Sequence, residues 1–133
     1  MTPAEAESLG RRWLAAGGGW RAGMLSMDGW RVVHAAGIVA CVTDGDGNAD
    51  AIERRECSPG LLSPPDLRDP ATMGVCLAVV RERLDSPMFR TDALYALRVS
   101  ERCWQLYTDT HAYSWADGTT EAEALVRAME CAP

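Results

Sequence analysis

Two histidines are the side chains of this chain best suited to proton transfer near neutral pH. His111 lies in "DTHAYSW", close to Asp109, Tyr113 and Ser114. A histidine beside an acid and hydroxyl groups can act as a general base, so one hypothesis is a small hydrolase- or transferase-like enzyme that uses His111. His34 alternates with apolar strand residues, which is typical of a structural histidine in a sheet. The spacing around either histidine matches no catalytic motif, and we assign no catalytic residue.

The segment "DGDGNAD" resembles a calcium loop at its first positions, with Asp44, Asp46, Asn48 and Asp50 at alternate positions. A complete loop needs glycine at the sixth position and an acid at the twelfth, where this chain has Ala49 and Arg55. A solvated hairpin loop therefore fits better than a metal site. The sequence predicts no metal and no cofactor.

Aromatic and arginine side chains indicate a binding site more strongly than the histidines or the acidic loop indicate a catalytic or metal site. They stack on planar groups, bind anions and dominate protein interfaces. Those in or beside the expected strands are Trp20, Arg21, Trp30, Arg98, Trp104, Tyr107, His111 and Tyr113. We expect this set to bind a partner protein or a small anionic ligand. The alternative for any single tryptophan is that its ring fills the core between sheet and helices.

Composition excludes several classes of partner. The net charge is −6, and the thirteen basic residues are all arginines scattered among acids, so direct nucleic-acid binding is not expected. No apolar run is long enough to span a membrane, and the N-terminus lacks a signal-peptide pattern. The five cysteines form no C-x-x-C pair and are expected to be reduced and structural, as in a cytosolic protein.

Three segments have helical periodicity and begin at capping residues. The first starts at Thr2, Pro3 and Glu5 and stops at the glycines of 17–19. The second spans 70–84 after Asp69, and it is apolar around most of its surface, so we expect it to be the buried central helix. In the third, Thr120 and Glu123 predict a capping box.

Between the helices the hydrophobic period changes to two, which predicts strands. They are expected near 22–27, 30–36 and 38–43, with a weaker one near 51–56 and two or three more within 95–115. The order is α-βββ(β)-α-ββ(β)-α. This order predicts one α+β domain over 1–133, with an antiparallel sheet of about five to seven strands and three helices.

Three segments carry a resemblance to a known group of proteins. They are "PDLRDPATMGVCLAVVRERL", the opening "RRWLAAGGGWRAGMLSMDGWRVV" and the closing "TEAEALVRAMECAP". Together they resemble uncharacterised small bacteriophage and prophage proteins with a PDL-x-DPAT-x-G core helix and a TEAEALV-type final helix. The resemblance implies a phage gene product in the cytoplasm of its bacterial host, and it supplies no catalytic residues.

Residues and resemblance together favour a non-enzymatic binding protein. Its partner would be a host protein or a small anionic ligand, and one role of this kind is inhibition of host defence. Apolar strand edges and the tryptophan content favour a homodimer or higher homo-oligomer. The enzyme that uses His111, and an accessory protein of phage DNA metabolism acting through protein partners, are the alternatives.

Overall fold

The first two helices begin at the caps that the sequence predicts. In α1 (Pro3–Ala15) the Glu5 amide donates to the Thr2 hydroxyl at 3.2 Å, and the Thr2 amide donates to the Glu5 carboxylate at 2.7 Å. In α2 (Pro70–Leu84) the Thr72 amide donates to the Asp69 carboxylate at 2.8 Å. Both starts are local, because a short polar side chain satisfies an amide that the helix itself cannot.

The third helix, α3 (Glu121–Cys131), is capped differently from the expected box. The Glu123 amide donates to the Thr120 hydroxyl at 3.1 Å, as predicted. The Glu123 carboxylate, however, accepts from the amide and hydroxyl of Thr119, both at 2.7 Å. The box is therefore shared by two adjacent threonines.

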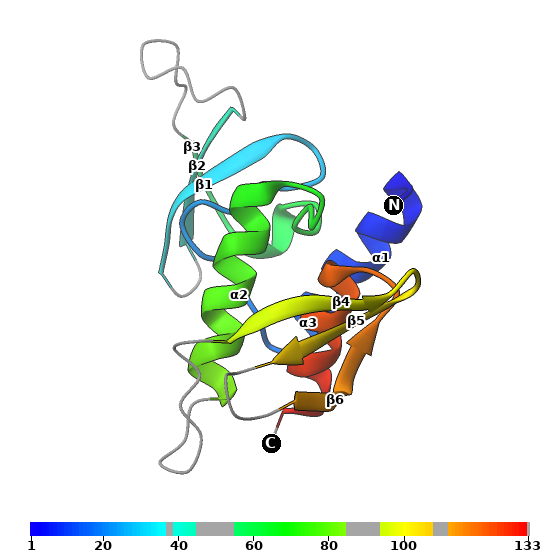
Figure 1. The fold of residues 1–133 in the computed structure, drawn as a ribbon. Coiled ribbons are helices and arrows are strands. Elements are labelled where there is room, and N and C mark those ends of the chain that lie inside the picture. Colours follow the sequence, from blue (N-terminus) through cyan, green and yellow to red (C-terminus); the bar gives the residue numbers. More distant parts are fainter. Residues whose placement is uncertain (37–38, 45–54, 85–93, 108–111, 133) are drawn as a thin grey trace.

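The computed structural model describes residues 1–36, 39–44, 55–84, 94–107 and 112–132. In these ranges six strands form two separate three-stranded antiparallel sheets, ordered β1-β2-β3 and β4-β5-β6 (Figure 1). The strands are β1 (Trp30–Ala36), β2 (Val39–Asp44), β3 (Arg55–Cys57), β4 (Tyr95–Ser100), β5 (Cys103–Tyr107) and β6 (Ala112–Gly118), and a short 3₁₀ helix covers Pro59–Leu61.

The α+β class is confirmed, but the described strands do not join into the one sheet that we expected. Neighbouring strands along the chain pair with each other, and α2 separates the two runs of strands in the sequence. The segment 22–27 makes only isolated bridges, Leu25 to Arg31 and Ser26 to Pro65. Each hairpin therefore closes locally, and no described strand pairs across the two sheets.

The central helix is α3, not α2. Six of its residues are buried, and it contacts α1, α2 and all three strands of the second sheet (Figure 1). In α2, which we expected to be buried on most sides, one stripe faces solvent. That stripe consists of Ala71, Gly74, Ala78 and Glu82. Small residues cost little when exposed, so their apolar character does not force burial.

A polar junction connects the first sheet to the helices. Arg31 on β1 donates to both carboxylate oxygens of Asp69, at 2.9 and 3.1 Å, and to the Gly23 carbonyl at 2.7 Å. The hydroxyl of the fully buried Thr72 donates to Asp69 at 2.8 Å and accepts from the Leu25 amide at 2.9 Å. This network fixes the start of α2 against β1 and its leading loop.

Candidate functional site

The first group of predicted site residues packs near the first sheet. Trp20 and Trp30 are half-buried and lie against the small apolar cluster around Val32. Arg21 is exposed and forms an ion pair with Glu82 of α2, with an N–O distance of 2.9 Å. The two indole rings therefore serve mainly packing, and Arg21 links two segments of the surface.

The second group lies in the second sheet. Arg98 is opposite Trp104 in the β4–β5 ladder. The Arg98 guanidinium donates to the carbonyls of Ser100 and Glu101 at 3.2 and 3.1 Å, so it holds the turn between these strands.

The structure brings Tyr107 into this sheet as well, and Tyr113 pairs in β6 opposite Leu106 through its backbone. His111, the remaining member of the predicted set, lies outside the described residues. The described members of the predicted set are thus divided between the two sheets.

One face of the second sheet has no described helix on it. Alternation in β4 turns Leu94 and Ala96 toward the core, and Leu106 of β5 is fully buried on that same side. The opposite side carries Tyr95 and Leu97, which are 41 and 45% exposed. Val99, which is 43% exposed, follows them at a bulge of β4 between Arg98 and Ser100. Figure 1 shows β4 and β5 in front of α3, which covers the inner side.

Two residues of β5 complete this face. Tyr107 lies opposite Tyr95, and their rings stack with centroids 6.2 Å apart and planes 21° from parallel. The Tyr107 hydroxyl donates to the Gln105 side chain at 2.8 Å. We call this surface the outer face and define it by Tyr95, Leu97, Val99, Gln105 and Tyr107. It is largely apolar and aromatic, which suits contact with a protein surface.

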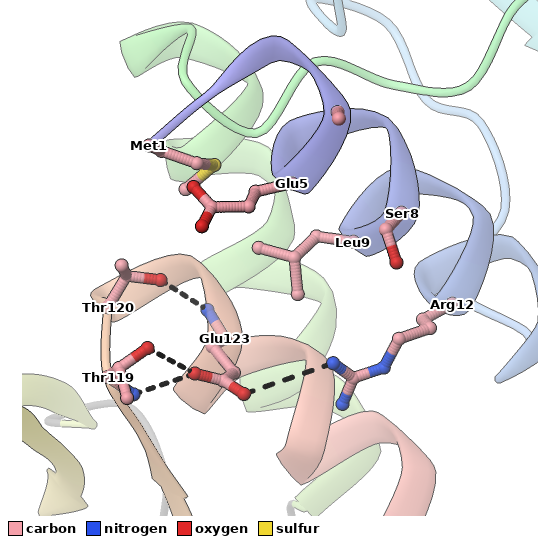
Figure 2. A pocket seen from close by; sticks show the side chains of 9 residues that line it. Met1, Glu5, Ser8, Leu9, Arg12, Thr119, Thr120 and Glu123 are labelled. Carbon is pink, nitrogen blue, oxygen red and sulfur yellow. Dashed lines mark hydrogen bonds and ion pairs between the residues drawn. The ribbon is translucent and has the colours of Figure 1, made fainter.

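A pocket of about 470 Å³ opens between α1 and the start of α3. Figure 2 shows its polar side chains: Glu5, Ser8 and Arg12 from α1, and Thr119, Thr120 and Glu123 from the other wall. The charged groups are already paired, since Glu5 caps α1, Glu123 accepts from Thr119, and an Arg12 nitrogen lies 4.0 Å from a Glu123 oxygen.

The carboxylates of this pocket are poorly suited to acid–base catalysis. Hydrogen bonds from the hydroxyl and amide of Thr119 hold the pKa of Glu123 below its ordinary value. The hydrogen bond from the Thr2 amide likewise lowers the pKa of Glu5. Acids with lowered pKa values stay ionised near neutral pH and are weak proton donors and bases there. The polar groups of the pocket therefore serve to cap the N-termini of α1 and α3.

The remaining candidate groups do not form a catalytic centre in the described part of the chain. His34 is exposed on β1 rather than held inside a sheet as expected, and none of the described hydrogen bonds involves it. Within the described ranges, no cluster of His, Cys, Asp and Glu side chains could hold a metal ion. The segment "DGDGNAD" continues outside these ranges from Gly45. None of the described helices is long and apolar enough to cross a bilayer.

Sequence reasoning identified Tyr107 but did not select Tyr95, Leu97 or Val99 as site residues. Their alternation predicts a strand with one apolar face, and that face is normally expected to point to the core. One signal in the sequence indicated that this face is exposed: Ala96, which lies between Tyr95 and Leu97, is also apolar, and it packs on the core. When a strand has apolar residues on both sides and only one side packs on the core, the other apolar side stays exposed.

The outer face is therefore the best-supported candidate site, and its description rests on this chain alone. Comparisons with protein-family models, with curated proteins and with solved structures found no match to the chain.

Proposed function

We propose that this chain is a non-enzymatic binding protein that contacts a partner protein through the outer face. In this proposal it is a phage or prophage gene product that acts on a host protein in the bacterial cytoplasm, with inhibition of host defence as its role. The phage origin is supported by the sequence resemblance described above. The mode of binding is supported by the structure of the second sheet.

The observation that carries the proposal is the row of Tyr95, Leu97 and Val99. These are three of the large apolar side chains that are most exposed. Tyr95 and Leu97 lie on alternate positions of β4, and Val99 follows at its bulge. Single exposed apolar residues are common, but a contiguous row beside a stacked tyrosine pair is typical of an interaction surface. Tyrosine is also enriched at the energetic centres of interfaces.

A protein partner is favoured over a small anionic ligand, which was the other expectation. A small anion needs arginine donors that converge on one point. Here Arg21 is paired with Glu82, and Arg31 is paired with Asp69. Arg98 donates to backbone carbonyls. These donors lie in different places and are already used.

Of the two alternative functions, an accessory protein is compatible with the outer face, whereas an enzyme would need a different site. An accessory protein of phage DNA metabolism would also act through a protein partner, so the outer face serves that role equally well. The enzyme hypothesis depends on His111, which lies outside the described residues, and it remains a prediction. Replacing His111 with alanine while partner binding persists would separate the binding role from an enzymatic one.

Site-specific photo-crosslinking tests the proposal. A photoreactive phenylalanine derivative replaces Leu97 in one version of the chain and Leu61 in another, and each purified protein is irradiated in a bacterial host extract. Leu61 is 80% exposed and lies in the 3₁₀ helix, away from the outer face. We expect position 97, but not position 61, to capture a defined host protein.

Competition provides the second readout. Excess unlabelled wild-type chain should abolish the captured band, whereas a Tyr95→Asp, Leu97→Asp competitor should be at least about tenfold weaker, equivalent to ~1.4 kcal/mol. A Leu61→Asp competitor should match the wild type. Equal capture from positions 61 and 97, or equal competition by the double variant, would show that the outer face does not bind the partner.

A further inference from the structure

We infer that the first sheet opens as a unit while the helices and the second sheet stay folded, and that the ion pair of Arg31 and Asp69 is the latch that holds it closed. This opening involves β1, β2 and β3, so it does not depend on the outer face or on the proposed function. Three features of the molecule support it: separate apolar clusters, an attachment at one end of β1, and a charged contact at that attachment.

The first sheet lies outside the main apolar core. That core draws its buried side chains from α1, α2, α3, β5 and the loops, and it includes none of the described side chains of β1, β2 or β3. The cluster of the first sheet is small, with Val32 as its described buried residue. The side chains packed on Val32 are only partly buried: Trp20, Trp30, Ala35, Cys57 and Leu62. Few buried apolar contacts give a segment a low free energy of local opening.

The first sheet is attached through one end of β1. In the part of the chain that the structure describes, its hydrogen bonds to the rest of the molecule involve only residues 30–32. Three of them are backbone bonds of 2.8 Å to the loop 23–26. This loop belongs to the main body, because Met24 is fully buried in the core and the Leu25 amide donates to Thr72 at 2.9 Å. No described helix lies along the strands, and Figure 1 shows them beside the start of α2, away from β6.

Arg31 supplies the charged contact of this attachment. Its guanidinium donates to both oxygens of Asp69 and to the Gly23 carbonyl. The side chains of Arg31 and Asp69 are only 27 and 13% exposed. A two-donor contact that is shielded in this way is stronger than a solvated surface pair. Because Asp69 lies at the start of α2, the contact holds β1 against the helical part of the molecule.

Opening of the latch unfolds the first sheet. A small sheet needs a broad hydrophobic face or a packed helix to be stable by itself, and the described part of this sheet buries only Val32. Its amides therefore lose their protection when it opens, and Val32, Trp20 and Trp30 become accessible. Both tryptophans belong to the set that the sequence predicts to bind a partner. The latch thus controls access to a second apolar surface.

Native-state amide exchange of the whole chain tests the inference. Exchange is followed by mass spectrometry at several urea concentrations below the unfolding transition. The amides of 30–36, 39–44 and 55–57 should share one opening, which is at least about a hundredfold more frequent than the opening that exposes α3. Equal opening frequencies and equal urea dependence in the first sheet and in α3 would overturn the inference, because the molecule would then unfold as one unit.

A core variant separates local from global opening. Leu77 packs on the main core and not on the cluster of the first sheet. Leu77→Ala weakens the closed and the locally open molecule equally, so it should speed exchange about tenfold in α3 and less than about threefold in the first sheet. Equal acceleration of both segments would show that the first sheet does not open separately.

A second variant tests the latch. Arg31→Gln removes the ion pair but leaves Asp69 to cap α2, and it should speed exchange of the first sheet about tenfold. Arg31→Lys, which keeps the charge, should lie between this variant and the wild type. Arg11→Gln removes the exposed pair with Glu7 in α1 and should leave the first sheet unchanged. First-sheet exchange that does not respond to Arg31→Gln would overturn the role of Arg31. Circular dichroism of each variant confirms that the fold is retained.

Discussion

Asp69 illustrates how one side chain can join three segments. It caps α2 through the Thr72 amide and accepts both guanidinium donors of Arg31. Burial raises the pKa of the Asp69 carboxyl, but hydrogen bonds from Arg31 and Thr72 lower it more, so the pKa lies below its ordinary value. The ionised form is therefore the one that the fold stabilises.

This lowered pKa predicts an acid-sensitive contribution to stability. Because the pKa of Asp69 is lower in the folded chain than in the unfolded chain, its contribution is complete above the unfolded pKa of about 4. It is lost as the pH falls through the folded pKa. Asp69→Asn should lower the free energy of unfolding by about 1–3 kcal/mol at pH 6–8, measured by urea denaturation.

The difference between wild type and Asp69→Asn should shrink below about pH 4, where Asp69 takes up a proton first in the unfolded chain and, at lower pH, in the folded chain. Glu121→Gln, which removes one exposed carboxylate from α3, is the control for the change in net charge. A difference that stays constant down to pH 2 would mean that the ionisation of Asp69 does not contribute to stability.

Cys76 is a second residue whose environment predicts its chemistry. It is fully buried in α2, and burial raises the pKa of its thiol to about 12. Because the thiolate is the reactive form, Cys76 should resist maleimide labelling at pH 8 in the folded chain and react after unfolding in urea. The exposed Cys131 should react at once. Mass spectrometry of timed samples checks this, and rapid labelling of Cys76 in the native chain would contradict it.

Among the elements, two helical glycines have opposite surroundings. A Cβ at Gly10 in α1 would overlap the Pro65 carbonyl oxygen, so no side chain fits. A Cβ at Gly74 in α2 would meet nothing within 4 Å. Gly74→Ala should therefore stabilise the chain by about 0.5–1 kcal/mol, because alanine is the better helix former.

Gly10→Ala makes the same chemical change in another helix and should destabilise the chain, because the added methyl group forces α1 away from 64–65. Thermal and urea denaturation of both variants measure the two effects. If both variants were more stable than the wild type, the close approach of α1 to Pro65 would be disproved.

Element starts were predictable from the sequence, because capping depends on residues three or four positions apart. Thr2 with Glu5, and Asp69 before Pro70, are examples. The direction in which a face points was less predictable. The stripe of Ala71, Gly74 and Ala78 reads as apolar but faces solvent. The row on β4 reads as a core face and also points outward, since α3 packs on the other side.

For the molecule as a whole, the position of α3 determines the packing. It lies among α1, α2 and the second sheet, and Leu125 at its middle is fully buried. Leu125→Ala should therefore cost about 3 kcal/mol or more, through lost burial and the cavity left behind. Urea denaturation followed by circular dichroism gives this value.

Leu77→Ala is the matched variant in α2, where the side chain is only partly buried. It should cost clearly less, about 1–2 kcal/mol, because the site is partly solvated. A larger loss from Leu77→Ala than from Leu125→Ala would return the central role to α2, as the sequence pattern first indicated.

Long-range organisation was the part that could not be read from the sequence. Hairpin signals such as Asp28-Gly29 correctly place a turn before β1, where Gly29 has a φ of +93°. Whether two runs of strands join into one sheet depends instead on contacts between distant residues. The candidate site has the same origin, because the outer face exists only where no described helix covers the sheet.

The location of α3 also has a consequence for biosynthesis. Arg12 of α1 bonds Glu130 of α3 across 118 positions of sequence, and the ribosome makes α3 after every other described element. Until then the nascent chain must hold Trp13 and Leu106 without their final neighbours. Such a chain folds late, after a long-range closure, and its core side chains stay exposed until α3 has been made.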